Sequence, residues 1–268
     1  MDIFVENLVQ IWDDGGDGIT ALDGITHHFA SAKLTCLLGP SGCGKSTLTQ
    51  IVGGIEQATS GTIRIVDPVN PTAPAKPGER SVMMWQNLNL FPWRNVIDNV
   101  AFGLEMAGVP RAQRYARARD MIASVGLKHF EEKRCSQLSG GMRQRVALAR
   151  ALVMDQPILL MDEPFAALDA QTKIVMQEEL TRIFERTRKT ILFVTHAIDE
   201  AILLGDEVVV MTARPGRIKE IIKIDLPRPR SQELINTPEF GDLYDRILHL
   251  IREEVLNAMQ QQNEAAEQ

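Results

Sequence analysis

The residues best suited to chemistry in this sequence lie in one glycine-rich stretch, "LLGPSGCGKSTLTQ", at positions 37–50. Its spacing fits the motif G-x-x-x-x-G-K-[ST], a loop whose backbone N–H groups turn inward around a phosphate. The apolar run "KLTCLL" precedes the loop and an apolar-periodic stretch follows it, so we expect a buried strand and then a helix whose N-terminus favours an anion. The alternative is a plain glycine turn, but four fixed residue types in eight positions seldom match by chance. The predicted nucleotide-binding residues of this loop are Gly39, Pro40, Ser41, Gly42, Cys43, Gly44, Lys45, Ser46 and Thr47.

A second stretch, "ILLMDEP" at 158–164, indicates hydrolysis. An apolar strand would deliver Asp162 at its C-terminal end, where ligands bind in parallel sheets. We expect Asp162 and the Ser46 hydroxyl to hold Mg²⁺, while Lys45 reaches the β- and γ-phosphates. Glu163 follows at once, and a carboxylate beside the metal can accept a hydrogen bond from a water in line with the γ-phosphate. The alternative is a strand that ends in a solvated acidic pair.

A third stretch, "QLSGGMRQRVALARAL" at 137–152, places a serine and two glycines before a strong helix. Such a helix start offers free N–H groups and could form a second anion site, although an N-cap alone would explain it as well. The candidate core positions of this helix are Val146, Leu148 and Leu152.

"LSGGM" close before "MDEP" resembles the signature of the ATP-binding cassette family, whose usual form ends in glutamine where this chain has Met142. The resemblance runs from about residue 3 to about residue 220. In that family two subunits sandwich two ATP molecules, and each signature faces the nucleotide held by the other subunit's phosphate loop. The resemblance implies a signature that acts on the partner's nucleotide and consists of Ser139, Gly140, Gly141 and Met142.

The same resemblance assigns roles to residues outside the two loops. Gln86, in "MMWQNLNLF", matches the glutamine that senses Mg²⁺ and the attacking water, and His196, in "FVTHAIDEA", matches the histidine that holds the γ-phosphate. Together with Glu163 these two would form the catalytic group. Asp169, in "FAALDA", matches the aspartate that links the two sites across the dimer. Trp12 is the candidate for stacking on adenine, with an ordinary core or surface aromatic as the alternative.

Apolar patterning along the chain predicts an α/β fold. Short alternating runs within 1–36 and at 61–66 indicate an antiparallel β subdomain, and the region from about 88 to 140 reads as a helical insertion. The runs "PILLMDEP", "TILFVTH" and "EVVVMTA" are typical of buried parallel strands. Together with this pattern, the resemblance implies a RecA-like P-loop NTPase with a mostly parallel sheet core over residues 1–220, followed by a short C-terminal helical extension over 221–268.

Composition limits the partners and the cellular location that the chain can have. The formal net charge of the 268 residues is −6, which argues against nucleic acid as the partner. The sequence has no run of 18 apolar residues, and "MDIFVENLVQ" lacks a signal pattern, so we expect the chain in the cytosol. Cys36, Cys43 and Cys135 form no C-x-x-C pair and read as free, reduced thiols.

Four segments resemble the importer ATPases for nitrate, taurine and other sulfonates: "LNLFPWRNVIDNVAFGLEMAGVP", "LSGGMRQRVALARAL", "MDEPFAALDAQTK" and "TARPGRIKEIIKIDLPRPR". That resemblance implies ATP and Mg²⁺ as cofactors, a second copy of the chain on ATP binding, two transmembrane permease subunits, and indirectly a solute-binding protein. It also implies a peripheral location on the cytoplasmic face of the membrane. The apolar "LFPWRNV" would be a socket for a permease helix, unless Phe91, Trp93 and Val96 merely pack the helical insertion onto the core.

Other function classes stay open at this point. They are a cassette ATPase that serves no transporter, an exporter, an importer of an unrelated small solute, a P-loop kinase and a degenerate scaffold. A kinase would need neither "LSGGM" nor the adjacent Asp162 and Glu163, and a degenerate site would have lost an expected residue. The cargo is not identified, because in an importer it would pass through other subunits.

Overall fold

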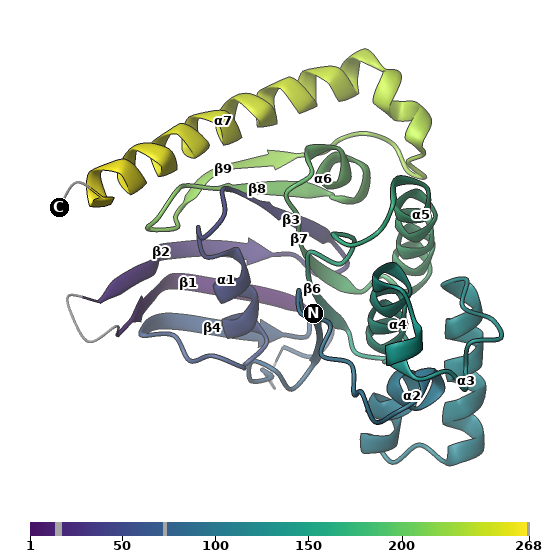
Figure 1. The fold of residues 1–268 in the computed structure, drawn as a ribbon. Helices are drawn as coiled ribbons and strands as arrows, with labels where there is room; N and C mark the ends of the chain where they lie inside the picture. Colours follow the sequence, from purple (N-terminus) through teal and green to yellow (C-terminus); the bar gives the residue numbers. More distant parts are fainter. Residues whose placement is uncertain (14–17, 72–73, 267–268) are drawn as a thin grey trace.

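The computed structural model contains two sheets with helices around them (Figure 1). The described residues are 1–13, 18–71 and 74–266. The smaller sheet has the order β2-β1-β4 and is antiparallel, formed by β1 (Asp2–Trp12), β2 (Ile19–Phe29) and β4 (Ser60–Val66). Its inward side chains alternate with exposed ones, as the sequence pattern predicts.

The larger sheet has the order β5-β6-β7-β3-β8-β9. Its strands are β3 (Leu34–Leu38), β5 (Ser81–Met84), β6 (Ile158–Asp162), β7 (Thr190–Val194), β8 (Glu207–Met211) and β9 (Ile218–Lys223). The first five in spatial order are parallel, and β9 runs antiparallel to β8 at the edge. Every residue of β3, β6 and β7 is buried, which explains their continuous apolar runs.

The predicted fold class is confirmed: a mostly parallel core sheet, an antiparallel sheet and a helical region. The helices are α1 (Lys45–Val52), α2 (Val96–Met106), α3 (Arg111–Ser124), α4 (Gly140–Leu152), α5 (Ala170–Thr187), α6 (Ile198–Leu204) and α7 (Pro238–Ala266), with short 3₁₀ turns η1 (Cys135–Gln137) and η2 (Gln232–Asn236). Helix α1 packs between the two sheets through Leu48, Ile51 and Val52. Helices α2 and α3 lie together to one side of the core and contact α4 (Figure 1).

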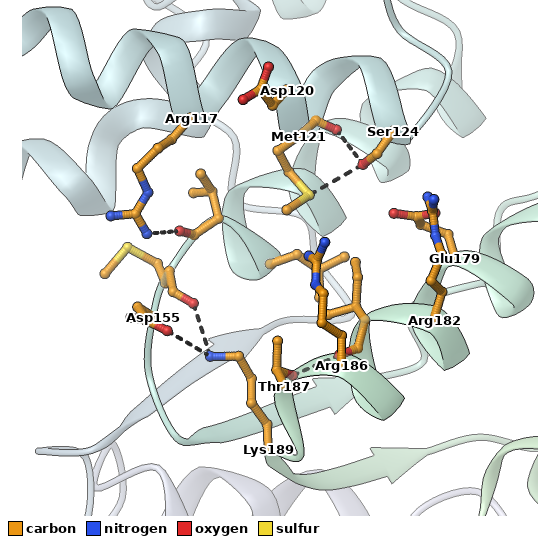
Figure 2. Close-up of a pocket in the computed structure, with 14 residues that line it drawn as sticks. Arg117, Asp120, Met121, Ser124, Asp155, Glu179, Arg182, Arg186, Thr187 and Lys189 are labelled. Carbon is orange, nitrogen blue, oxygen red and sulfur yellow. Dashed lines mark hydrogen bonds and ion pairs between the residues drawn. The ribbon is translucent and has the colours of Figure 1, made fainter.

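The helical region is fastened to the core where α4 ends. The segment 153–156, which follows α4, accepts hydrogen bonds from two cations: Arg117 donates to Val153 O at 2.9 Å, and Lys189 donates to Gln156 O at 2.5 Å. Figure 2 shows them in a 450 Å³ cleft between α3 and α5. Because the carbonyl at a helix C-cap has no intrahelical donor, Arg117 stabilises the end of α4 at Val153, while Lys189 holds the segment that follows it. Burial lowers the pKa of Lys189.

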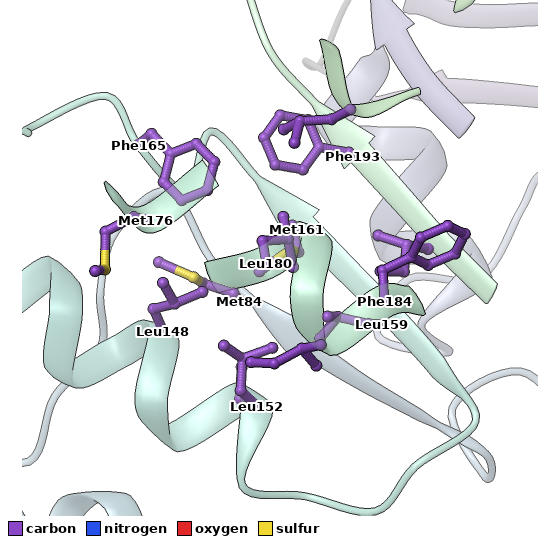
Figure 3. Close-up of a cluster of buried hydrophobic side chains, with 14 of the residues drawn as sticks. Met84, Leu148, Leu152, Leu159, Met161, Phe165, Met176, Leu180, Phe184 and Phe193 are labelled. Atoms are coloured by element: carbon purple, nitrogen blue, oxygen red, sulfur yellow. The ribbon is translucent and has the colours of Figure 1, made fainter. Parts of the chain in front are cut away.

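An apolar cluster between α4, α5 and the core sheet fixes the direction of the signature helix (Figure 3). The three predicted core positions of α4, Val146, Leu148 and Leu152, are all buried, so that prediction is confirmed. The three cysteines are buried and free, as expected. The edge strand β9 was not predicted, and α7 lies along this side of the sheet, with Phe240 and Ile247 buried.

Candidate nucleotide-binding site

The glycine-rich loop connects β3 to α1, so the predicted strand and helix flank it. Lys45 is 5% exposed, and its ammonium donates to the carbonyls of Gly39 and Pro40 at 2.9 Å each. Gly44 has φ +94°, and a Cβ there would lie 2.5 Å from Cδ2 of Leu22. Glycine is therefore required at this turn, because a side chain would meet both backbone strain and a buried neighbour.

Beside the loop lies a pocket of 330 Å³. Residues 41–47 of the loop line it together with Gln86, Glu163 and His196, three side chains that are far from the loop in sequence. Trp12 also lines it and is 37% exposed, so its ring is accessible to a ligand. The structure thus brings the predicted loop, the predicted catalytic group and the candidate adenine-stacking residue to one pocket.

Asp162 ends β6 directly before Glu163, which lines this pocket, and is 3% exposed. Burial raises the pKa of its carboxyl group, the neighbouring Glu163 raises it further, and a hydrogen bond from Ser46 opposes the shift. Its Oδ1 is buried and has no hydrogen-bond partner among the described residues. Buried polar atoms are almost always satisfied, so this oxygen is suited to bind a ligand such as a metal ion.

These residues fit Mg²⁺. Among the described residues no group of three or more His, Cys, Asp or Glu could hold a metal ion by itself. Mg²⁺ is usually bound by one or two carboxylates, waters and phosphate oxygens rather than by a protein cage. One buried carboxylate next to a hydroxyl and a phosphate loop is such a donor set.

We expect Asp162→Asn to stabilise the nucleotide-free chain at neutral pH. A carboxyl group whose pKa is raised by folding favours the folded state while it is protonated, and that contribution is lost as the pH rises through the folded pKa. Removing the charge should raise Tm by roughly 2–4 °C, the shift that about 1 kcal/mol gives in a protein of this size. Thermal unfolding should show the gain at pH 7 and its decrease toward acid pH.

The control for this change is Asp120→Asn, because Asp120 is an exposed residue of α3. Its Tm should differ little from that of the native chain. Equal Tm values for Asp162→Asn and the native chain across this pH range would contradict the unfavourable burial of the Asp162 charge.

Glu163 is held between two side chains. His196 Nε2 lies 2.5 Å from Glu163 Oε1, and Gln86 Nε2 donates to Oε2 at 3.3 Å. The backbone of Glu163 has φ +50°, a strained conformation for a residue with a side chain. Its N–H donates to Val194 O at 3.0 Å, which ties the end of β6 to the end of β7. Strain that the surrounding strands maintain is common at functional sites, and here it aims a carboxylate into the pocket.

Sequence reasoning missed Gln144, the polar residue that connects the signature helix to Glu163. Its Nε2 donates to the Glu163 carbonyl at 3.3 Å, and its Oε1 accepts from Ala167 N at 2.7 Å. Gln144 is 3% exposed. The available signal was its spacing of four residues before Leu148, which places a glutamine on the apolar face of α4.

We expect Gln144→Ala to lower kcat several-fold and the free energy of unfolding by about 1–3 kcal/mol, because it leaves a buried donor and a buried acceptor unpaired. The matched control is Gln177→Ala, which removes another buried glutamine, 4% exposed, whose Oε1 accepts from Gln232. Denaturant unfolding and steady-state hydrolysis should show lower stability in both variants but lower kcat in Gln144→Ala alone. Equal kcat in the two variants would show that Gln144 acts only on stability.

The signature residues lie outside the pocket of the phosphate loop. Ser139 is the N-cap of α4, its side chain accepts from Met142 N at 3.3 Å, and Ser139 and Gly140 are exposed. Asp169 caps α5 and is also exposed; the hydrogen bond from Thr172 N lowers the pKa of its carboxyl group. None of these residues lines the pocket of the phosphate loop within the described chain.

Comparison with known proteins agrees with this geometry. The sequence profile described as ABC transporter matches residues 22–166. An uncharacterised ABC transporter ATP-binding protein of Methanocaldococcus jannaschii is 47% identical over 255 residues, which cover 95% of this chain and 93% of that protein. The taurine import ATP-binding protein TauB of Burkholderia pseudomallei is 45% identical over 210 residues, covering 78% of this chain and 79% of TauB.

Solved structures give the same result. The fold matches the dimeric structure of MJ0796, a bacterial ABC transporter cassette, with a TM-score of 0.75 and 28% identity, over 84% of this chain and 100% of that one. A dimeric post-hydrolysis state of MJ0796 bound to ADP and Pi matches with a TM-score of 0.74 and 27% identity, over the same shares of the two chains. This chain belongs to the ABC transporter family and is an ATP-binding cassette ATPase.

Proposed function

We propose that this chain is the Mg²⁺-dependent ATPase subunit of an importer for a small anion or sulfonate-like solute of the nitrate, taurine and alkanesulfonate class. The observation that carries the proposal is the position of Glu163, held between Gln86 and His196 at the mouth of a phosphate-loop pocket. The solute class is supported by the taurine import relatives, one of which, from Pseudomonas putida, is 49% identical over 193 residues.

In the proposed site each residue has a distinct task. Residues 39–47 bind the phosphates, with Lys45 as the cation, and Trp12 stacks on adenine. Ser46, Asp162 and Gln86 hold Mg²⁺, which when bound would neutralise charge on the phosphates. Glu163 accepts the proton of the attacking water, and His196 orients Glu163 and the γ-phosphate. The contacts of Gln86 and His196 with the Glu163 carboxylate limit its rotation, which lowers the entropic cost of placing the water.

A second copy of the chain completes the proposed site. Its signature, Ser139–Gly140–Gly141–Met142 by position, would face the γ-phosphate, and Asp169 would link the two sites. The exposure of Ser139 and Asp169 leaves both available to a partner. The dimeric structures of MJ0796 support this arrangement. ATP can drive the cycle because it binds the closed dimer better than the open one.

The proposed permease contact lies next to Gln86. Trp93 is 72% exposed, and its ring lies 5.5 Å from that of Phe91. Val96, in contrast, is fully buried at the start of α2. It packs in the core and is not available to a permease helix. In the described part of the chain, every helix is too short or too polar to cross the bilayer. We propose a peripheral position on the cytoplasmic face, on two permease subunits served by a solute-binding protein, with no nucleic-acid partner.

The test is solute uptake by proteoliposomes that contain the chain, its permease subunits and the solute-binding protein. With Mg-ATP supplied on the side of the ATPase, taurine or nitrate should accumulate, and chelation of Mg²⁺ should abolish both uptake and hydrolysis. Hydrolysis without uptake of any solute of this class would favour the alternatives, a non-transport cassette ATPase or an importer of an unrelated solute. Absence of Mg-ATP hydrolysis from the complete assembly would overturn the proposal.

A further inference from the structure

The loop at 212–217, which connects β8 to β9, brings a cation to the nucleotide pocket. Arg214 lines that pocket, and its Nη2 lies 3.3 Å from the position that a Cβ on Gly42 would occupy. Gly42 is part of the phosphate loop and is exposed. Arg214 therefore places its guanidinium directly against the backbone that is expected to surround the phosphates.

The Arg214 guanidinium forms no hydrogen bond or ion pair within the described parts of the chain, whereas Arg217 of the same loop is paired with Asp23. The loop itself is fixed: Gly216 N donates to Ala21 O at 3.0 Å, and Asp23 N donates to Gly216 O at 3.0 Å. Arg214 is exposed, so solvent satisfies its guanidinium in the free chain, and the fixed loop keeps this unpaired cation beside the anion site, where a ligand can bind it.

Helix α7 also contacts this loop, through Glu254. Glu254 is 5% exposed, and its Oε2 accepts from Ala213 N at 2.7 Å while its Oε1 accepts from Lys219 Nζ at 2.7 Å. A second cavity, of 460 Å³, lies between the loop and α7, and Arg214 and Glu254 both line it. Arg214 is thus one residue from the backbone amide that α7 holds, and it borders both cavities.

We propose that Arg214 is a nucleotide-binding residue that contacts the phosphate chain, and that Glu254 on α7 is the positioning residue that sets its place. Guanidinium groups form strong charge-assisted hydrogen bonds with phosphate oxygens. Through this contact the C-terminal helix controls the nucleotide affinity of the core. The inference rests on the proposed ATP-binding function and adds a residue and a means of control to it.

The experiment measures the equilibrium affinity of the full chain for ADP with a fluorescent label on the ribose, without Mg²⁺. Arg214→Gln should weaken binding about tenfold, which corresponds to one charge-assisted hydrogen bond. Arg214→Lys should lie between this variant and the native chain, since lysine keeps the charge without the planar fork. Lys223→Gln, at an exposed position of β9, removes the same charge away from the pocket and should leave the affinity unchanged.

Glu254→Ala and Glu253→Ala form the matched pair for the positioning role. Both remove a partner of Lys219, but only Glu254 holds Ala213 N. Glu254→Ala should weaken ADP binding about three- to tenfold and Glu253→Ala should not. In the Arg214→Gln background, Glu254→Ala should cost nothing further, because the two changes act through one contact.

Native affinity in Arg214→Gln would overturn the phosphate contact. An equal loss from Glu254→Ala with and without Arg214 would overturn the positioning role and leave only an effect on loop stability. A native chain that binds labelled ADP no better than Lys45→Ala would overturn the proposed function itself. The failure of the proposed function can be told apart from the failure of this inference. In the first case the native chain itself does not bind ADP, whereas in the second the native chain binds ADP and Arg214→Gln binds it equally well.

Discussion

Replacement of Glu163 by glutamine is expected to slow Mg-ATP hydrolysis by a factor of about 10² to 10⁴, the range that a positioned general base contributes. Glutamine has nearly the same shape as glutamate, and its amide can still meet Gln86 and His196, but it cannot accept a proton from water. ATP binding should persist, since the phosphate loop is untouched. Single-turnover release of phosphate measures the chemical step, and equilibrium titration with labelled ATP measures the affinity.

The same variant should also trap the nucleotide-bound dimer. Since hydrolysis reopens the dimer in the proposed cycle, a chain that binds ATP without cleaving it should sediment as a dimer with Mg-ATP and as a monomer without it. Glu178→Gln, at an exposed position of α5, is the matched control and should hydrolyse ATP at the native rate. A Glu163→Gln rate within a factor of about two of the native rate would show that another group takes the proton.

The core of the site could be predicted because its signals are local in sequence. A phosphate loop needs glycines, a lysine and a hydroxyl within eight positions, and the structure shows why at Gly44, where a Cβ would meet Leu22. The parallel strands could be predicted for a similar reason, because burial on both faces of the sheet requires a continuous apolar run. Helix α4 could be predicted from the helical spacing of its apolar residues.

The features that sequence reasoning missed depend on neighbours that are distant along the chain. Strand β9 is recognisable only through its pairing with β8, because "IKEIIK" lies at a sheet edge and buries only Ile222 fully, so it has no continuous apolar run. Nothing in the local sequence distinguishes Arg214 from other loop arginines, and only the fold places it against Gly42. The sequence left Val96 open between a surface socket and core packing, and the position of α2 decides for packing by burying it. In each case tertiary contacts decide a role that local pattern leaves open.

Two inactive variants are expected to restore hydrolysis when they are mixed. Lys45→Ala disables the phosphate loop, and Ser139→Arg blocks the signature with a bulky cation, so each homodimer should have no working site. In the mixed dimer one site combines both defects, while the other has an intact loop from one chain and an intact signature from the other. If association is statistical, about half the dimers are mixed and have one of two sites, so about a quarter of native activity should return.

A double variant, Lys45→Ala with Ser139→Arg, distinguishes a site shared between two chains from a site contained within one chain. If the sites are shared, a dimer of the native chain with the double variant has a defect in each of its two sites, so an excess of the double variant should suppress native hydrolysis. If each chain hydrolyses ATP alone, mixing restores nothing and the double variant suppresses nothing, and that result would contradict the shared site. Suppression without restoration would still require shared sites, and would add that both must be intact for either to turn over.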